Sequence, residues 1–337
     1  MLAFDTFQLE LEDPLESASE TIETRRGCIV RYGDGLGEAT PLVPWTESYD
    51  EMIESVSALE GGDRPLRPRL DDLESNPAAR HGVTLAMADH LARERDQPLY
   101  RFLGGTHSRE RIPVNATLDG TDQGALRSAG ERLASEGYPA VKLKVGAQTP
   151  DLDLERIATV REAIGDDVDL RIDANGAWSR QQAIDLAADL TRFDLDYVEQ
   201  PTEGIDDAVC QAYADHGIPI AMDEALRTEG TTAVLLADID AVVIKPMAVG
   251  GIDNARAIAM AARGCGITPV ISNLVTGSIA RTAAAHVVAS LPTCVPAGLD
   301  TGHRLRSDLT ETVPTVSGGH LELPPGNGLG LSEATDD

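Results

Sequence analysis

From Ile112 onward, short apolar runs alternate with longer segments of helical periodicity, and this alternation restricts the fold more than any other feature of the chain. In the longer segments apolar residues recur every three or four positions, and two of these segments stop at Gly137 and Gly165. Ser179 begins a capping-box sequence before a third. The runs that predict strands cover residues 113–118, 140–145, 168–172, 195–198, 219–222, 241–244, 268–271 and 297–299. Eight strands separated by helices predict an α/β fold, namely a TIM-like (β/α)₈ barrel.

The first 108 residues follow a different pattern, with strands that precede helices. Residues 4–11 and 27–32 read as strands on either side of a polar segment, about residues 12–26. We interpret that segment either as an ordinary mobile loop or as a lid. A helix is expected from Pro77. The sequence therefore predicts an α+β domain over residues 1–108, the barrel over 109–310, and a tail over 311–337 that returns to the first domain.

Lysine is almost absent from the chain, and its three lysines lie in predicted strands or directly after one. Lys142 and Lys144 alternate with apolar residues in the second barrel strand, so both side chains lie on one face. Lys245 follows the apolar run of the sixth strand. A single lysine at a strand end often extends to solvent. Three such positions are better explained by function, because an ammonium group among apolar residues is costly unless an anionic group faces it.

Single acidic residues end three successive barrel strands: Asp173, Glu199 and Asp223. In a (β/α)₈ barrel these strand ends converge on the face that carries the active site. Each acid taken alone is explained as a helix cap. Together, and flanked by lysine-bearing strands, they favour a cation that joins the carboxylates. Hard oxygen ligands indicate Mg²⁺, with Mn²⁺ as the alternative.

Taken together, these motifs resemble the enolase superfamily, specifically its muconate-lactonising-enzyme-like subgroup. The matching pieces are K-x-K at 142–144, D-A-N at 173–175, E-Q-P at 199–201, D-E at 223–224, Lys245, G-x-G-E at 35–38 and P-G-N-G-L-G at 325–330. The resemblance implies that the N-terminal domain and the tail form a capping domain over the barrel. It also implies that Asp173, Glu199 and Asp223 bind Mg²⁺, that Lys144 is the catalytic base, and that Lys245 faces it.

The resemblance implies further residues around this centre that orient ligands or contact the substrate. Those near the metal and the lysines would be Lys142, Asn175, Gln200 and Glu224. Those in the loops after the seventh and eighth strands would be Asn273, Thr276 and Gly298. The lysine pair serves proton abstraction, whereas the two loops would select the substrate.

Two kinds of reaction follow from the resemblance. G-L-D-T at residues 298–301 is similar to the same motif in o-succinylbenzoate synthases, and a D-x-D motif typical of dipeptide epimerases is missing there. The resemblance therefore implies first a Mg²⁺-dependent lyase of menaquinone biosynthesis. It would dehydrate 2-succinyl-6-hydroxy-2,4-cyclohexadiene-1-carboxylate to 2-succinylbenzoate. The alternative is an N-acylamino acid racemase or a dipeptide epimerase. A barrel retained only for binding is disfavoured, because all five metal and lysine positions are filled.

Composition excludes several classes of partner. A net charge of −28 argues against nucleic acid and against an anionic membrane surface. No apolar run reaches the length of a membrane span, and no signal peptide is evident. Four scattered cysteines suggest neither a disulfide framework nor a zinc site. We therefore expect a cytoplasmic enzyme for a small-molecule carboxylate, and the sequence is compatible with a homo-oligomer.

An acidic chain with so little lysine also suggests a protein that stays soluble at high salt, as in a halophilic organism, because added ions screen its self-repulsion. We expect the free energy of unfolding to rise as KCl increases from low to molar concentrations. Urea titrations at several KCl concentrations measure this, and a steady fall in stability would contradict it.

Overall fold

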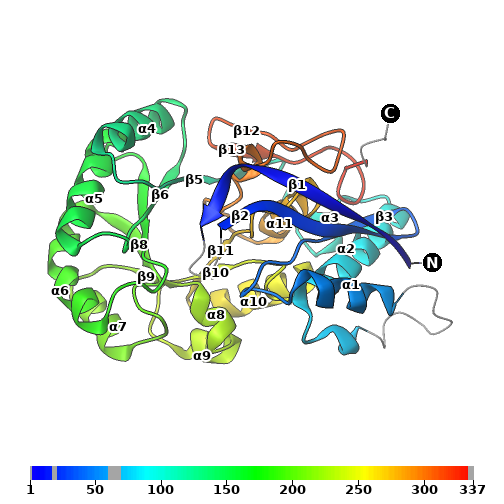
Figure 1. The fold of residues 1–337 in the computed structure, drawn as a ribbon, viewed down its shortest axis with the longest axis horizontal. Helices are drawn as coiled ribbons and strands as arrows, with labels where there is room; N and C mark the ends of the chain where they lie inside the picture. The colour runs from blue at the N-terminus through cyan, green and yellow to red at the C-terminus, as the bar shows by residue number, and fades with distance from the viewer. Residues whose placement is uncertain (1, 17–20, 60–69, 333–337) are drawn as a thin grey trace.

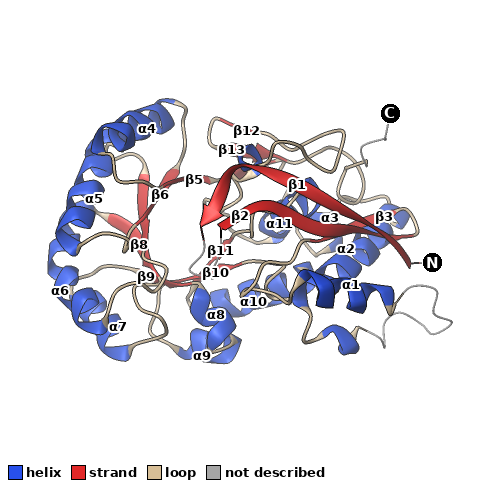
Figure 2. Cartoon of the chain, in the orientation of Figure 1, coloured by secondary structure: helices blue, strands red, loops and turns tan. Residues whose placement is uncertain are grey.

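The computed structural model describes residues 2–16, 21–59 and 70–332. It contains a curved parallel sheet with helices on its outer side and, next to it, an antiparallel sheet packed on helices (Figure 1). The main apolar core lies between the parallel strands and the helices around them, and a second core lies mainly under the antiparallel sheet. Figure 2 shows how strands alternate with helices through the parallel part. No helix within the described residues is long and apolar enough to cross a membrane.

Seven parallel strands form the barrel sheet in sequence order. They are β5 (Asn115–Leu118), β6 (Ala140–Lys144), β7 (Asp169–Asp173), β8 (Leu195–Glu199), β9 (Ile220–Met222), β10 (Ala241–Ile244) and β11 (Thr268–Ile271). Each lies within a residue or two of a predicted run. The α/β barrel with a capping domain is therefore confirmed as the fold class.

The eighth predicted strand, at residues 297–299, is not a strand in the structure. Ala297 and Gly298 instead make isolated parallel bridges to Val114 and Ser272, which lie beside the two edge strands β5 and β11. Hydrogen bonds reach both edges, from Gly298 N to Ile271 O and from Asn115 N to Ala297 O. The segment closes the gap between the edges but is too short to pair as a regular strand.

Helices connect the barrel strands, and their ends match local sequence signals. They are α4 (Gln123–Ser135), α5 (Pro150–Ile164), α6 (Arg180–Leu190), α7 (Asp207–Asp215), α8 (Glu224–Thr228), α9 (Thr231–Leu236), α10 (Ile252–Gly264) and α11 (Ser278–Ser290). The capping box at Ser179 is confirmed, since its hydroxyl accepts from Gln182 N while its own N–H donates to the Gln182 side chain. Every residue of α11 is buried, because this helix lies between the barrel and the N-terminal part.

The N-terminal part, which we call the capping unit, has three antiparallel strands and three α-helices within its described residues. They are β1 (Leu2–Glu16), β2 (Thr21–Tyr32), β3 (Gly35–Ala39), α1 (Tyr49–Ser57), α2 (Pro77–Glu94) and α3 (Leu99–Phe102). The helix expected from Pro77 is confirmed. Gly37 is required where β3 lies on α2, because a Cβ there would come within 1.9 Å of the Gly82 carbonyl oxygen.

The polar segment 12–26 differs from the loop or lid expected from the sequence, because most of it belongs to the β1–β2 hairpin. Glu10 pairs with Thr24 and Leu15 with Ile22 across a register shift. Its polar side chains conceal the alternation that would have predicted strands. Residues 17–20 lie outside the described residues, and a lid over about residues 12–26 stays a prediction.

The C-terminal tail contacts both parts of the molecule. Its strands β12 (Val316–Ser317) and β13 (His320–Glu322) form a small sheet with β4 (Arg111–Pro113). Further on, Leu329 N donates to Asp89 Oδ1 on α2 at 2.6 Å, and Leu99 N donates to Gly328 O at 2.7 Å. The tail therefore joins β4, the segment that precedes the first barrel strand, to α2 and α3 of the capping unit.

A buried carboxylate links the capping unit to the barrel. Glu38, on β3, accepts hydrogen bonds from Gly277 N at 2.7 Å and Ala280 N at 2.8 Å. It thus satisfies backbone donors in the first turn of α11 from a different part of the chain. Complete burial raises the pKa of Glu38 above its ordinary value, although hydrogen bonds oppose the shift. Arg25 adds a second link by donating to Val275 O in the loop before α11.

Candidate active site

The strand register brings two lysines and two carboxylates together at one end of the sheet. Lys144 on β6 is paired with Asp173 on β7, and Asp173 with Glu199 on β8. The Lys144 ammonium lies 2.7 Å from Asp173 Oδ2. Lys142 lies 3.2 Å from that oxygen and 3.0 Å from Glu199 Oε2. Alternation along β6 places both lysines on the same face as the acids.

The third lysine and the third acid complete the set from the next strands. Asp223 follows β9 and Lys245 follows β10, and Lys245 Nζ lies 2.5 Å from Asp223 Oδ2. Strands β7, β8 and β9 lie between β6 and β10 in the curved sheet. Lys144 and Lys245 therefore approach the carboxylates from opposite sides.

Three residues predicted to orient the ligands lie directly behind this set. Asn175 accepts from Lys144 Nζ at 2.7 Å and donates to Glu224 Oε1 at 3.0 Å. Gln200 accepts from the backbone N–H groups of Asp223 and Ala225 at 3.0 and 3.1 Å. Asn175 and Gln200 have φ values of 45° and 41°, a left-handed conformation that is uncommon outside glycine and is concentrated at functional sites.

Burial makes the charges at this site depend on one another. Asp173 and Glu199 are 0% and 1% exposed. Burial opposes ionisation of Asp173, but Lys144 and Lys142 hold the pKa of this carboxyl far below its usual range. Burial together with the charge of Asp173 raises the pKa of Glu199 to about 8. Burial disfavours the charge on Lys142 as well, yet Glu199 and Asp173 outweigh it and raise the pKa of Lys142 well above its ordinary value.

The acids have the character of a divalent-cation site. Asp223 Oδ1 is buried and has no hydrogen-bond partner, a costly state for a carboxylate oxygen that a cation would relieve. Three carboxylates with oxygen-only donors match the preference of Mg²⁺. Among the described residues, however, no three acidic, histidine or cysteine side chains are already grouped at metal-binding distances. In this structure the lysine ammonium groups hold the oxygens.

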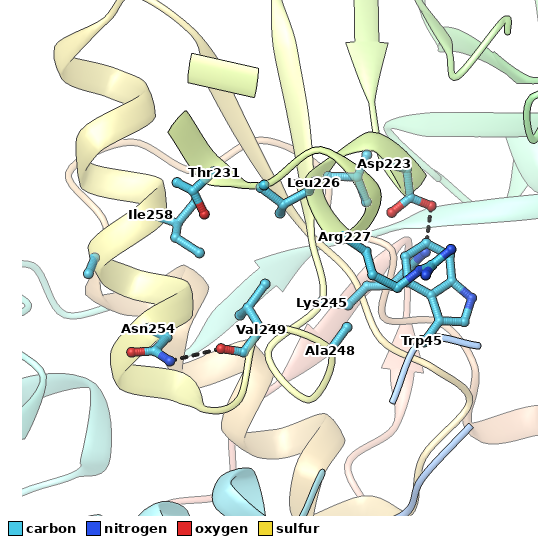
Figure 3. A pocket seen from close by; sticks show the side chains of 13 residues that line it. Trp45, Asp223, Leu226, Arg227, Thr231, Lys245, Ala248, Val249, Asn254 and Ile258 are labelled. Atoms are coloured by element: carbon cyan, nitrogen blue, oxygen red, sulfur yellow. Dashed lines mark hydrogen bonds and ion pairs between the residues drawn. The ribbon is translucent and has the colours of Figure 1, made fainter. Parts of the chain in front are cut away.

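Trp45 covers Lys245 from the capping unit, in the loop between β3 and α1. The Lys245 Nζ atom lies 3.4 Å from the ring centroid, and the Arg227 guanidinium carbon lies 5.9 Å from it (Figure 3). An ammonium group over an indole face is a favourable cation–π contact. The sequence pattern does not reveal Trp45 as a site residue, because 200 positions separate it from Lys245.

The remaining predicted contacts form a separate group after β11. Asn273 donates to Thr301 Oγ1 at 2.9 Å, the Thr276 hydroxyl is buried without a partner, and Gly298 lies in the segment that closes the barrel. In the described part of the chain, none of the three hydrogen-bonds to the lysines or acids above. Val275, between the first two, has a φ of 54°, a strained value for a β-branched residue.

Asp300, from the G-L-D-T motif, contacts side chains that do not belong to the lysine–carboxylate set. Its Oδ2 accepts from the Tyr138 hydroxyl at 2.7 Å, and its Oδ1 lies 3.5 Å from His303 Nδ1. Tyr138 precedes β6, on the side of the barrel next to α4. The motif that favoured a synthase on sequence grounds therefore directs its acid away from the two catalytic candidates.

Comparison with known proteins gives a consistent family. The family model for enolase C-terminal domain-like proteins matches residues 125–336. The chloromuconate cycloisomerase CbnB of Cupriavidus necator is 31% identical over 92% of this chain and 87% of its own length. The N-succinyl-L-Arg/Lys racemase of Bacillus cereus is 27% identical over 93% of this chain and 87% of its own length.

A solved structure supports the same family assignment. The dipeptide epimerase of Enterococcus faecalis, crystallised with Mg and the dipeptide L-Leu-L-Tyr, superposes with a TM-score of 0.88 and 25% identity over 98% of this chain and 99% of the other. These relatives are racemases, epimerases and cycloisomerases, so they favour the alternative drawn from the sequence over the dehydration. The chain belongs to the enolase superfamily, among the enolase C-terminal domain-like proteins.

Proposed function

We propose that the protein racemises or epimerises the α-carbon of an amino acid whose amino group is acylated. One observation carries the proposal: Lys144 and Lys245 reach a common set of carboxylates from opposite sides of the barrel. Inversion at a carbon next to a carboxylate needs one group to remove the proton and another to return a proton to the opposite face. The racemase and epimerase among the relatives support this choice.

The proton transfers are then assigned by position. Lys144, as the neutral amine, removes the α-proton of one enantiomer, and the electron pair of the broken C–H bond passes into the carboxylate as an enediolate. The Lys245 ammonium group returns a proton to the other face, and the two lysines exchange roles for the opposite enantiomer. Lys142 lies within 3.2 Å of Asp173 and 3.0 Å of Glu199, and as an ammonium group it would stabilise the enediolate electrostatically.

We propose Mg²⁺ as the cofactor, with Mn²⁺ as the alternative, held by Asp173, Glu199 and Asp223. The bound ion would polarise the substrate carboxylate and lower the energy of the enediolate. The three acids each lie against a lysine ammonium group. A cation that binds the same oxygens would compete with the lysines for them. Lys144 and Lys245 would thereby be released toward the substrate.

The contacts of Asp300 bear on whether the substrate nitrogen is a free ammonium group or an acylated one. A free ammonium group on the substrate needs an acid to receive it, whereas the printed side-chain contacts of Asp300 are with Tyr138 and His303, away from the lysine–carboxylate set. An acylated, uncharged nitrogen needs no such partner. We therefore favour an N-acylamino acid over a dipeptide with a free amino terminus, while the same lysines serve both.

The second candidate is the dehydration that forms 2-succinylbenzoate, supported by the G-L-D-T motif at 298–301. In that reaction Lys144 would remove the α-proton and then, as its conjugate acid, assist the departure of hydroxide. Lys245 would remain charged throughout. The lysine and carboxylate geometry serves either reaction, so the products must separate them.

Incubation of the Mg²⁺-loaded protein with an N-acyl-L-amino acid in D₂O tests the proposed function. We expect the D-enantiomer to appear with deuterium at the α-carbon, because the returned proton comes from a solvent-exchanged lysine. Chiral chromatography and mass spectrometry measure both. Formation of an aromatic product from the cyclohexadiene substrate, with no deuterium in any N-acylamino acid, would establish the dehydration instead.

The metal site is tested by Asp223→Asn. The substitution removes a negative charge from the proposed ligand set, so Mg²⁺ affinity measured by calorimetry should fall at least about tenfold. Asp207→Asn, on the exposed surface of α7, provides the control and should leave affinity unchanged. An unaltered Mg²⁺ titration in Asp223→Asn would remove this residue from the ligand set.

A further inference from the structure

The two lysines proposed to transfer protons differ in the neutral group that accompanies their carboxylate partner. Lys144 donates to its carboxylate partner and also to the Asn175 side-chain oxygen, both at 2.7 Å. Within the described ranges, Asp223 is the only hydrogen-bond acceptor of Lys245 Nζ. The Trp45 indole lies beside the same ammonium group, with its ring centroid 3.4 Å from Nζ (Figure 3). The indole therefore has the position at Lys245 that the Asn175 amide has at Lys144.

The two lysines also differ in burial. Both lie at the end of a barrel strand or directly after one, yet the side chain of Lys245 is 12% exposed and that of Lys144 is 37% exposed. Trp45 and Lys245 both line a cavity of about 430 Å³, whose other walls include residues of α8, α9 and α10. A flexible four-carbon side chain beside such a space can move away from the carboxylates unless another group restrains it.

The loop that carries Trp45 is fixed on both sides of the indole. Trp45 N donates to Leu42 O at 2.8 Å, and Leu42 N donates to Thr46 Oγ1 at 2.8 Å. Directly after this turn, the Glu47 carboxylate accepts from two backbone N–H groups in the first turn of α2, at 2.8 and 3.0 Å. A group that is already held by its own hydrogen bonds can position another group without being ordered at the moment of reaction.

We propose that Trp45 is the positioning residue of Lys245, and that its ring holds the ammonium group at the face of the substrate where the proton is returned. The inference rests on the proposed function and adds a residue of the capping unit to it. Once Asp223 ligates a cation, it no longer serves as the carboxylate partner of Lys245. An indole ring is no ligand for Mg²⁺ and keeps its contact with the ammonium group. The Asn175 amide serves Lys144 in the same way on the opposite face.

Acetylation of the lysines tests the contact without any substrate. The chain has three lysines, so digestion and mass spectrometry follow each of them separately. Acetic anhydride reacts with the free amine, and a ring that holds and covers the ammonium group slows this reaction. In the Mg²⁺-loaded protein we expect Trp45→Leu to accelerate acetylation of Lys245 about fivefold or more and to leave Lys144 unchanged. Without Mg²⁺ the effect should be smaller, because Asp223 still holds Lys245. Trp45→Phe, which keeps an aromatic face, should give an intermediate rate.

Deuterium exchange on separate enantiomers tests the consequence for turnover. Lys245→Ala identifies the two faces, because it should spare exchange of the N-acylamino acid enantiomer whose α-proton Lys144 removes. For the other enantiomer, Trp45→Leu should lower kcat for exchange in D₂O about tenfold with little change in KM. Exchange of the enantiomer that Lys144 serves should stay within about twofold of wild type, whereas a merely structural role would slow both.

Tyr49→Leu provides the matched control. Tyr49 begins α1 in the same capping unit, and its ring centroid lies 3.9 Å from the guanidinium carbon of Arg26. The residue therefore makes the same kind of contact but does not line the cavity. Its substitution should alter neither the acetylation of Lys245 nor the exchange of either enantiomer.

Equal acetylation of Lys245 in wild type and Trp45→Leu, measured with Mg²⁺, would overturn the inference. Equal loss of exchange for both enantiomers would also overturn it. The same bias in Tyr49→Leu would do so as well, since the effect would then belong to the capping unit as a whole. Absence of exchange of both enantiomers in wild type would count against the proposed function instead, and acetylation would still decide whether Trp45 holds Lys245.

Discussion

The buried carboxylates Asp173, Glu199 and Asp223 depend on opposite charge, and the site is organised around that requirement. Isolated charges at this depth are too costly to persist, so each acid lies against a lysine. The same contacts prepare the chemistry, because a cation that takes over the carboxylate oxygens would set Lys144 and Lys245 free. The lysine–carboxylate contacts that balance the buried charges thus involve the same groups to which we assign the proposed chemistry.

The capping unit, which is distant from the barrel strands in sequence, also contributes to the site. Glu38 holds the first turn of α11, Arg25 holds the strained loop at Val275, and Trp45 covers Lys245. These contacts join β2, β3 and the following loop to the C-terminal ends of β10 and β11. Lys144 and the three acids belong to the barrel strands or follow them directly, whereas Lys245 also contacts the capping unit through Trp45.

Sequence periodicity predicts most of the barrel, because a strand and a helix that follow one another leave local signals. Lys144 and Asp173 are predictable as site partners because each ends a strand of a repeating unit. The outer part of the β1–β2 hairpin, at residues 12–16 and 21–26, escapes prediction because its polar residues hide the alternation. The closing segment at 297–298 depends on both sheet edges at once. The contact of Trp45 with Lys245 arises only when two distant parts of the chain pack together, and no local pattern encodes it.

The central claim is that Lys144 and Lys245 act on opposite faces of the same carbon, and single substitutions measured on separate enantiomers test it directly. With Mg²⁺ in D₂O, Lys144→Ala and Lys245→Ala should each lose racemisation by at least about 100-fold. Each variant should still exchange the α-proton of one enantiomer, and the two variants should select opposite enantiomers. Exchange of the same enantiomer by both variants, or near wild-type racemisation by either, would contradict the account.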